Sequence, residues 1–356
     1  MEKSAFSKIV MYKEVTTVRD ERIDFLRFIG LSMIILAHVD PPGVIFQMRN
    51  FDVPLMVIVA GLSFRESYKD EPYLSYLWSR AKRLILPVWL FLSIYFLVIL
   101  KTGYPIATLS TKEIVSSYLL LDDIGIGYVW IIRIFLLVAT VSPFIYSYCQ
   151  HQSSHRKYLF AITIIYLAYE LTLTISKPFL NSPLGYVFEK TILYLIPYSV
   201  VFSIGLRLPD LRRNQLLIIG SVAFAIFIYW AEVYWLLSGK FVHTQYFKYP
   251  PQSYYLSYAI FIAVVVWASS ERIIKIFRKL YVWSAILFVG QNSMWIYLLH
   301  IPLIKIIILP FYLKYPLVFS CAAILTFLQV KFVKKHILPN ISNPTIKRNV
   351  SLLLTG

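Results

Sequence analysis

The sequence predicts an all-α polytopic membrane protein with about ten transmembrane helices and both termini in the cytoplasm. Hydrophobic residues make up 58% of the chain and charged residues only 15%, whereas a soluble domain has about 45–50% apolar and about 25% charged residues. The chain also holds 27 Tyr, 25 Phe and 8 Trp, as expected where aromatic side chains mark membrane interfaces. These observations argue against an ordinary soluble domain.

A transmembrane helix needs about 20 mostly apolar residues, and ten segments approach that length. They are Ile23–Val39, Phe51–Phe64, Leu84–Leu100, Tyr128–Tyr148, Tyr158–Ile175, Ile192–Leu206, Gln215–Ser238, Tyr254–Ser269, Ser284–Leu309 and Tyr315–Val333. The second is short, and we expect Pro302 to interrupt the ninth because proline ends or kinks a helix. A further segment, Ile114–Leu121, is too short to span and is expected to be re-entrant or interfacial.

The positions of the cationic residues predict the orientation, because Lys and Arg concentrate on the cytoplasmic side of a membrane. With the N-terminus inside, 24 of the 35 Lys and Arg fall in cytoplasmic segments, nine in outer segments and two, Arg27 and Arg133, inside spans. This asymmetry explains the net charge of +17 without a nucleic-acid partner. We expect cytoplasmic tails at residues 1–22 and 336–356 and one membrane domain at residues 23–335.

No pattern in the sequence indicates a metal site or a permanently bound cofactor. Cys149 and Cys321 form neither a disulfide framework nor a metal-ligand spacing. Motifs of serine hydrolases, zinc proteases, P-loop proteins and dinucleotide-binding enzymes are absent from the sequence. The outer loop Gly239–Ser253 is rich in aromatic residues and proline, which fits either a platform for a sugar or an interfacial aromatic belt, and the belt is the simpler interpretation.

The first predicted helix carries three polar residues, Asp24, Arg27 and His38, although a charge at membrane depth costs roughly 2.5–3.5 kcal/mol. The eleven-residue step from Arg27 to His38 is about 1100° on a helix, so the two share a face about 16 Å apart. That face is expected to meet protein rather than lipid. An imidazole with an ordinary pKa near 6.5 can take a proton from a hydroxyl, so His38 is the leading catalytic candidate, and a structural histidine is the alternative.

A second group, Ser293, Tyr297 and His300, is spaced by four and three residues, which places all three on one helical face. We expect Pro302 to leave His300 beside backbone carbonyls without helical partners. His300 could orient a substrate or a catalytic partner, and a structural hydrogen bond at the kink fits equally well.

Two further pairs of residues are candidates for substrate contact. Arg80 and Arg83 lie three residues apart at the cytoplasmic rim, a spacing suited to bidentate contact with phosphate, although from spacing alone a membrane anchor is favoured. Trp130 and Arg133 lie one turn apart near the outer start of the fourth span. Arg133 is expected to line a cavity or to pair with a carboxylate, for which the candidates are Glu170 and Glu232.

These motifs, in this order, resemble the membrane-bound acyltransferase-3 family, whose members O-acylate bacterial surface sugars. The matching features are Arg-Ile-Asp-Phe-Leu-Arg27 with ten residues to His38, Asp52-Val-Pro54 leading to Gly61, Arg80-Ala-Lys-Arg83 before Leu-Ile-Leu-Pro87, Tyr-Val-Trp130, and Ser293, Tyr297 and His300-Ile-Pro302. One departure is Ala60-Gly61-Leu62, where many members have Ser-Gly-Phe, so that serine hydroxyl is missing here.

The resemblance implies an acyl-CoA donor bound from the cytoplasm and an acyl group passed to a hydroxyl on the outer side of a bacterial inner membrane. By position, it implies that His38 is the catalytic histidine, Arg27 its essential companion, and Arg80 with Arg83 the donor-binding pair. The implied partners are acyl-CoA, a glycan or glycolipid acceptor and membrane lipids.

The sequence therefore predicts an integral-membrane O-acyltransferase, in the simplest case an O-acetyltransferase that uses acetyl-CoA and acts on a cell-surface or lipid-linked glycan such as capsule or lipopolysaccharide. His38 is expected to act as general base, with Arg27 and Asp24 orienting it or stabilising charge. A covalent acyl-His38 intermediate is the competing mechanism. A polysaccharide transporter or flippase is the alternative class, since buried charges and broken helices also suit transporters.

Overall fold

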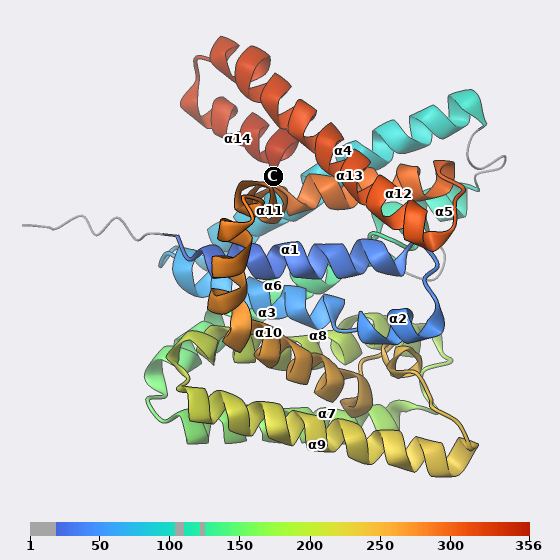
Figure 1. The fold of residues 1–356 in the computed structure, drawn as a ribbon, viewed down its shortest axis with the longest axis vertical. Coiled ribbons are helices and arrows are strands. Elements are labelled where there is room, and N and C mark those ends of the chain that lie inside the picture. Colours follow the sequence, from blue (N-terminus) through green and yellow to red (C-terminus); the bar gives the residue numbers. More distant parts are fainter. Residues whose placement is uncertain (1–18, 104–109, 122–124) are drawn as a thin grey trace, which may run out of the picture.

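The computed structural model describes residues 19–103, 110–121 and 125–356, and within these ranges every regular element is a helix (Figure 1). This confirms the predicted all-α class. Residues 1–18 of the predicted N-terminal tail lie outside the described residues.

The α-helices are α1 (Glu21–Ala37), α2 (Gly43–Met48), α3 (Asp52–Ser67), α4 (Tyr73–Thr102), α5 (Thr111–Tyr118), α6 (Trp130–His151), α7 (His155–Ser176), α8 (Pro183–Arg207), α9 (Arg213–Ser238), α10 (Ser253–Lys279), α11 (Trp283–Gln291), α12 (Ser293–Ile306), α13 (Phe311–Phe332) and α14 (Pro344–Thr355). Four short helical turns join them: η1 (Leu208–Asp210), η2 (Thr244–Phe247), η3 (Val333–Ile337) and η4 (Leu338–Asn340).

Seven helices in the described part of the chain are long and apolar enough to cross a membrane. They are α2 with α3, α4, α6, α7, α8 with η1, α9, and α13 with η3 and η4. The pair α11 and α12 would make an eighth span if it is counted as one bent segment. The helices α1, which has 17 residues, and α10 overlap predicted spans but are not among the seven. The chain is a multi-pass membrane protein.

The break in the ninth predicted span lies at Asn292 and not at Pro302. The helices α11 and α12 meet there at 86°, because Asn292 adopts φ −113° and ψ 26°, outside the helical region. Pro302 lies inside α12, which continues to Ile306. The proline removes only the helical hydrogen bond to the carbonyl of Leu298, and the remaining bonds carry the helix past it.

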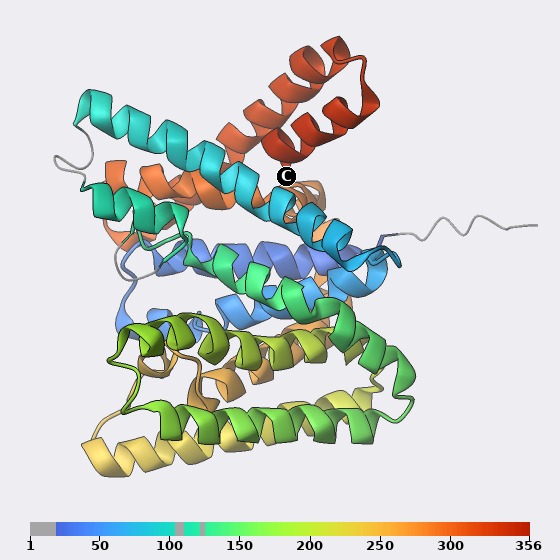
Figure 2. The same cartoon turned by 180° about the vertical axis from the view of Figure 1, so that it is seen from behind.

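Helix α1 lies at the centre of the molecule, between a layer that contains α3, α6 and α8 and a layer that contains α12 and α13 (Figures 1 and 2). It packs against α3, α10, α11, α12 and α13. Glycine allows two of the helix crossings to be close. A Cβ at Gly290 of α11 would lie 2.2 Å from the carbonyl oxygen of Asp24, and one at Gly61 of α3 would lie 2.4 Å from that of Phe202 in α8. Gly61 and Gly290 therefore lie where a side chain would collide with the backbone of the neighbouring helix.

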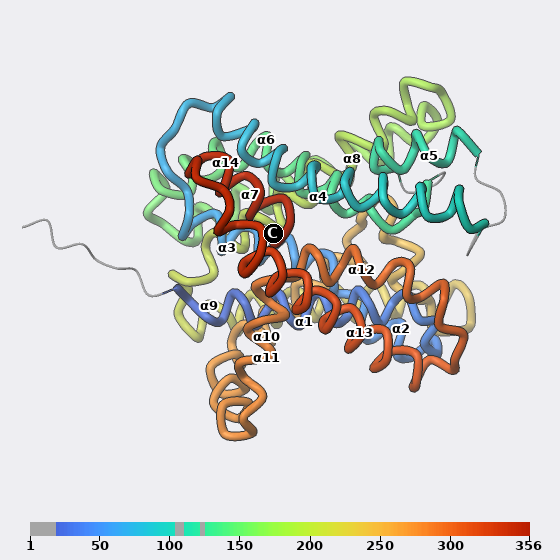
Figure 3. The backbone as a smooth tube through the Cα atoms, turned by 90° about the horizontal axis from the view of Figure 1, so that it is seen from above, coloured from blue at the N-terminus to red at the C-terminus, as the bar shows by residue number. Residues whose placement is uncertain are grey.

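The helices farthest from α1 present apolar side chains outward, as lipid contact requires. Only Leu216, Gly220 and Ala223 of α9 are buried, and α9 packs against α10 at one edge of the molecule (Figure 2). Seen along the perpendicular direction, α11 and α5 project on opposite sides of the bundle (Figure 3). The segment predicted at Ile114–Leu121 is α5, an eight-residue helix that begins with a capping box.

Candidate active site

Two cavities lie one after the other along α1. The first, which we call the arginine cavity, has a volume of about 860 Å³ and is lined by Arg19, Arg27, Arg80 and Arg83 among others. The second, the histidine cavity, has a volume of about 110 Å³ and is lined by His38. Both linings include Ile131 of α6 and Tyr297 of α12, so these two side chains stand where the cavities meet.

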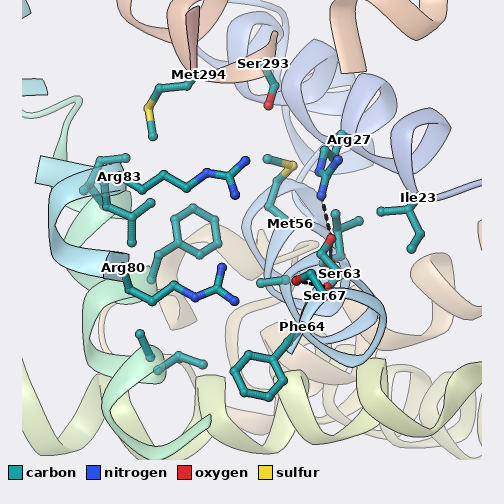
Figure 4. A pocket seen from close by; sticks show the side chains of 18 of the residues that line it. Ile23, Arg27, Met56, Ser63, Phe64, Ser67, Arg80, Arg83, Ser293 and Met294 are labelled. Carbon is teal, nitrogen blue, oxygen red and sulfur yellow. Dashed lines mark hydrogen bonds between the residues drawn. The ribbon is translucent and has the colours of Figure 1, made fainter. Parts of the chain in front are cut away.

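The arginine cavity is strongly cationic. Within the described residues, its lining holds four arginine side chains and one acidic side chain, that of Glu66. Arg80 and Arg83 reach into the cavity from α4, opposite Arg27 of α1 (Figure 4). The guanidinium carbon of Arg80 lies 5.3 Å from the ring centroid of Tyr76 and 5.6 Å from that of Phe64. This geometry fits a bound anion such as phosphate better than the simple membrane anchor that the spacing alone favours.

Asp24 holds Arg27 in place at the arginine cavity. The fully buried Asp24 carboxylate accepts from Arg27 Nη1 at 2.7 Å and from Arg19 Nη2 at 2.6 Å. The second terminal nitrogen of Arg27 donates to Ser63 Oγ at 2.6 Å. Neither Asp24 nor Arg27 contacts His38. Arg27 and His38 line different cavities, because two residues on one face lie about 16 Å apart along the helix axis. That Arg27 and Asp24 orient His38 or stabilise charge during transfer stays a prediction.

His38 pairs with His300, although 262 residues separate them in the chain. His38 Nδ1 lies 2.9 Å from His300 Nε2, and the two rings are nearly coplanar, at 11°. His300 is fully buried, and its Nδ1 bonds the backbone carbonyl of Tyr297. The residues therefore meet as a pair of side chains from α1 and α12, which sequence spacing could not indicate.

The Tyr297 carbonyl fixes the proton positions of this pair. A carbonyl oxygen only accepts, so His300 Nδ1 carries a proton and, in the neutral ring, His300 Nε2 is an acceptor. His38 Nδ1–H must then donate to it, which leaves His38 Nε2 without a proton. Among the residues that the structure describes, none bonds to this Nε2. The pair thus presents an unprotonated imidazole nitrogen, which is the requirement for a general base.

Three other predicted residues of α12 and α6 line these cavities: Ser293, Tyr297 and Trp130. Ser293 and Tyr297 border the arginine cavity, and Tyr297 donates from its hydroxyl to the carbonyl of Tyr128. Trp130, the first residue of α6, borders the histidine cavity. The ring of Tyr128 packs edge-on against His38 at 4.7 Å between centroids. One face of α12 therefore runs along both cavities, as its spacing predicts.

The family model for an acyltransferase domain, acyltransferase-3, matches residues 20–329. The chain belongs to the acyltransferase-3 family. The matched segment contains every residue of the two cavities described above except Arg19 and Gly356. No curated protein and no solved structure matched the chain.

The acyltransferase has a buried ionic cluster that the sequence did not single out as a group. Arg49, Asp52 and Lys248 all line the histidine cavity and are only 2–3% exposed. Asp52 Oδ2 accepts from Arg49 Nη1 at 2.9 Å, and its Oδ1 accepts from Lys248 Nζ at 3.2 Å. Arg49 and Lys248 counted only as outer cations in the sequence. The signal that could have identified them was an Arg and an Asp three residues apart at the start of a short span.

The aromatic loop at residues 239–253 of this acyltransferase is only partly exposed. Tyr246 is 75% exposed, as a belt residue would be. However, Gln245, Lys248 and Tyr249 turn inward and line the histidine cavity. The ring of Tyr249 packs edge-on against Trp130 at 5.1 Å between centroids. This part of the loop therefore forms one wall of the site.

Asp24 and His300 line neither cavity, but they bond Arg27 and His38, which do. Arg133 also lines neither cavity. It is buried, donates to the carbonyl of Leu120 at 3.3 Å and lies 5.3 Å from the ring of Tyr194. Glu170, one of its proposed partners, instead accepts from the Tyr166 hydroxyl and the Ser253 backbone. In the described ranges, no three His, Cys, Asp or Glu side chains lie together as metal ligands would.

Proposed function

We propose that this acyltransferase moves an acyl group, in the simplest case acetyl, from acyl-CoA in the cytoplasm to a hydroxyl of a cell-surface or lipid-linked glycan. The observation that carries the proposal is the pair of cavities along α1. One is cationic and large enough for a phosphate-bearing donor, and the other presents an unprotonated histidine nitrogen beside the first.

The proposal includes a topology of ten spans, in which α1, α10 and the bent pair α11–α12 cross the membrane together with the seven other segments. The positive-inside distribution of Lys and Arg supports it. Both termini then lie in the cytoplasm, with tails at residues 1–22 and 336–356 and a membrane domain at residues 23–335. In this orientation the arginine cavity faces the cytoplasm, where acyl-CoA is made, and the membrane is the inner membrane of a bacterium.

Donor binding would use the charge of the arginine cavity. Coenzyme A carries a diphosphate and a further phosphate, and guanidinium groups bind such oxygens bidentately. Arg80 and Arg83 project into the cavity from α4, and Arg27 is held opposite them by Asp24. The thioester end of the donor would then pass Tyr297 and Ile131 to reach His38. Coenzyme A is a substrate in this scheme, and no permanently bound cofactor is needed.

In the proposed reaction, His38 Nε2 takes the proton of the acceptor hydroxyl while the hydroxyl oxygen bonds to the thioester carbonyl carbon. The carbonyl electron pair moves onto its oxygen. When that carbonyl re-forms, the carbon–sulfur bond breaks and the CoA thiolate takes the proton from His38. His300 positions the base through its hydrogen bond to Nδ1. Holding both substrates beside this base supplies the remaining acceleration.

Transfer by the purified protein tests this function. Radiolabelled acetyl-CoA and the envelope glycans of cells that lack the gene serve as donor and acceptor, with mass spectrometry to locate the acetyl ester. We expect the wild type to label a glycan and His38→Ala to lose labelling at least a hundred-fold while it remains folded. His336→Ala, a change of an exposed histidine that lines neither cavity, is the matched control. Full transfer by His38→Ala would contradict the assignment.

A further inference from the structure

The buried cluster in the histidine cavity carries an excess positive charge. Arg49 and Lys248 are cations, and Asp52 is the one carboxylate among the described residues of the cavity lining. All three are at most 3% exposed, so solvent screens them little. Taking charges out of water costs several kcal/mol for each ion, and only a matched partner offsets it. Arg49 and Lys248 share the carboxylate of Asp52, whose single charge balances only one of the two cations.

One hydrogen-bond donor of the cluster has no partner among the described residues and is free to bind a ligand. Both oxygens of Asp52 are engaged, by Arg49 and Lys248 and by the backbone N–H of Val53. The Nε–H of Arg49 is buried and has no partner among the described residues. A buried donor left unpaired costs about 1–3 kcal/mol. An anionic oxygen in the cavity would satisfy both the excess charge and the free donor.

The size of the histidine cavity limits which chemical groups can supply the anionic oxygen. At about 110 Å³ it is smaller than the cavity of about 150 Å³ that holds one benzene molecule. It can therefore take an acyl carbonyl and the attacking hydroxyl, but not a whole sugar ring as well. His38, with its free Nε2, lines the same space. During acyl transfer, one negative charge develops on the carbonyl oxygen, and it does so beside the base.

We propose that Arg49 and Lys248 form the anion site that stabilises the carbonyl oxygen of the acyl group in the tetrahedral intermediate. This inference rests on the proposed acyl transfer. The acceptor oxygen bonds to the carbonyl carbon, its proton goes to His38 Nε2, and the carbonyl electron pair comes to rest on the oxygen that faces the two cations. Preorganised donors in a site without bulk water stabilise such charge more than water does. Asp52 is the positioning residue that holds both cations toward the cavity.

Removal of one cation tests the site. In Lys248→Met the net charge of the cluster falls from +1 to zero, so the transfer rate at saturating acetyl-CoA should fall about a hundred-fold, with the KM for acetyl-CoA within about two-fold of wild type. In the double variant Asp52→Asn with Lys248→Met, Arg49 alone restores the charge, and the rate should be at least about ten-fold that of Lys248→Met. Lys240→Met, an exposed lysine of the same loop, is the matched control.

A pH profile of the wild type provides a second measurement that does not depend on whether a variant folds. Lys248 lies in the loop before α10, and burial lowers its pKa to about 8 against the opposing effect of Asp52. The groups that face it are Arg49, Asp52, Asn50 and His38 and the rings of Trp130, Tyr249 and Tyr255. The lysine is charged below that pH, so the saturated rate should fall more than about ten-fold from about pH 7 to about pH 9.5.

The outcomes separate this inference from the function on which it rests. A wild type without any transfer overturns both. A wild type that transfers, together with a folded Lys248→Met variant within about three-fold of its rate, or a saturated wild-type rate that does not fall with pH, overturns the anion site alone. A Lys248→Met variant that changes only the acceptor concentration needed for half-maximal rate also overturns it, because the cation would then bind a charged group of the acceptor.

Discussion

At the scale of single residues, the site depends on where one proton sits. The carbonyl of Tyr297 can only accept a hydrogen bond, so His300 Nδ1 carries a proton and His300 Nε2 accepts from His38 Nδ1–H. His38 Nε2 is therefore left without a proton. In the part of the chain that the structure describes, no carboxylate bonds to either ring of this histidine pair. His38 itself could be recognised in the sequence, because an imidazole inside an apolar helix is unusual. The sequence left several roles open for His300 and could not show that it bonds His38. Hydrogen bonds between helices depend on how the helices pack.

His300 tests this chain of hydrogen bonds. His300→Phe keeps a ring of similar size but offers no acceptor to His38 Nδ1, so the transfer rate at saturating acetyl-CoA should fall about a hundred-fold with an unchanged KM. His300→Gln can still accept through its amide oxygen and should retain more than about ten-fold the activity of the phenylalanine variant. Equal rates for the two variants would show that His300 acts only through packing.

Arg83 tests the binding of the donor. Each charge-assisted hydrogen bond contributes about 1.5–3 kcal/mol, so Arg83→Met should raise the KM for acetyl-CoA about ten-fold or more and change the saturated rate much less. Lys82→Met is the matched control, because Lys82 lies between the two arginines in sequence but outside both cavity linings, 5.5 Å from the ring of Trp78. An unchanged KM in Arg83→Met, measured by steady-state kinetics, would remove Arg83 from the donor site.

At the scale of helices, the sequence located nearly every segment but not the breaks and contacts between them. Long apolar runs gave the helices because lipid requires backbone hydrogen bonds within one segment. The predicted break at Pro302 is wrong, because proline is tolerated inside a packed helix. The 86° bend lies instead at Asn292, whose backbone leaves the helical conformation. The inward course of the loop that carries Lys248 was also missed, because it depends on tertiary contacts with Asp52 and Asn50.

Substitution of Gly61 tests the close crossing of α3 and α8. A side chain at Gly61 would meet the carbonyl oxygen of Phe202 at 2.4 Å, and a backbone atom cannot turn aside as a flexible side chain can. Gly61→Ala should therefore lower the stability of the detergent-solubilised protein by about 1–3 kcal/mol, seen as a lower melting temperature. Gly220→Ala, whose added Cβ would meet its nearest neighbour at 3.7 Å, should leave the melting temperature unchanged, and equal effects of the two changes would contradict the crossing.

At the scale of the whole molecule, the two cavities give α1 a direction. Arg27 lines the arginine cavity and His38 lines the histidine cavity, so the polar residues of one helix lead from the proposed donor site to the proposed base. The sequence predicted this order along α1, since it follows from helical rise. It could not predict that Ile131 and Tyr297 stand between the cavities, because they come from α6 and α12 and meet only in the folded protein.

The central claim is that the protein acylates a glycan and that His38 performs the transfer. The most direct measurement is the O-acetyl content of the surface glycans of cells that lack the gene, complemented with wild type or with His38→Ala, alongside the total amount of polymer. We predict that both strains export the same amount of polymer and that only the wild type restores its O-acetyl esters. Loss of the polymer itself without the gene, or restored acetylation by His38→Ala, would contradict the account.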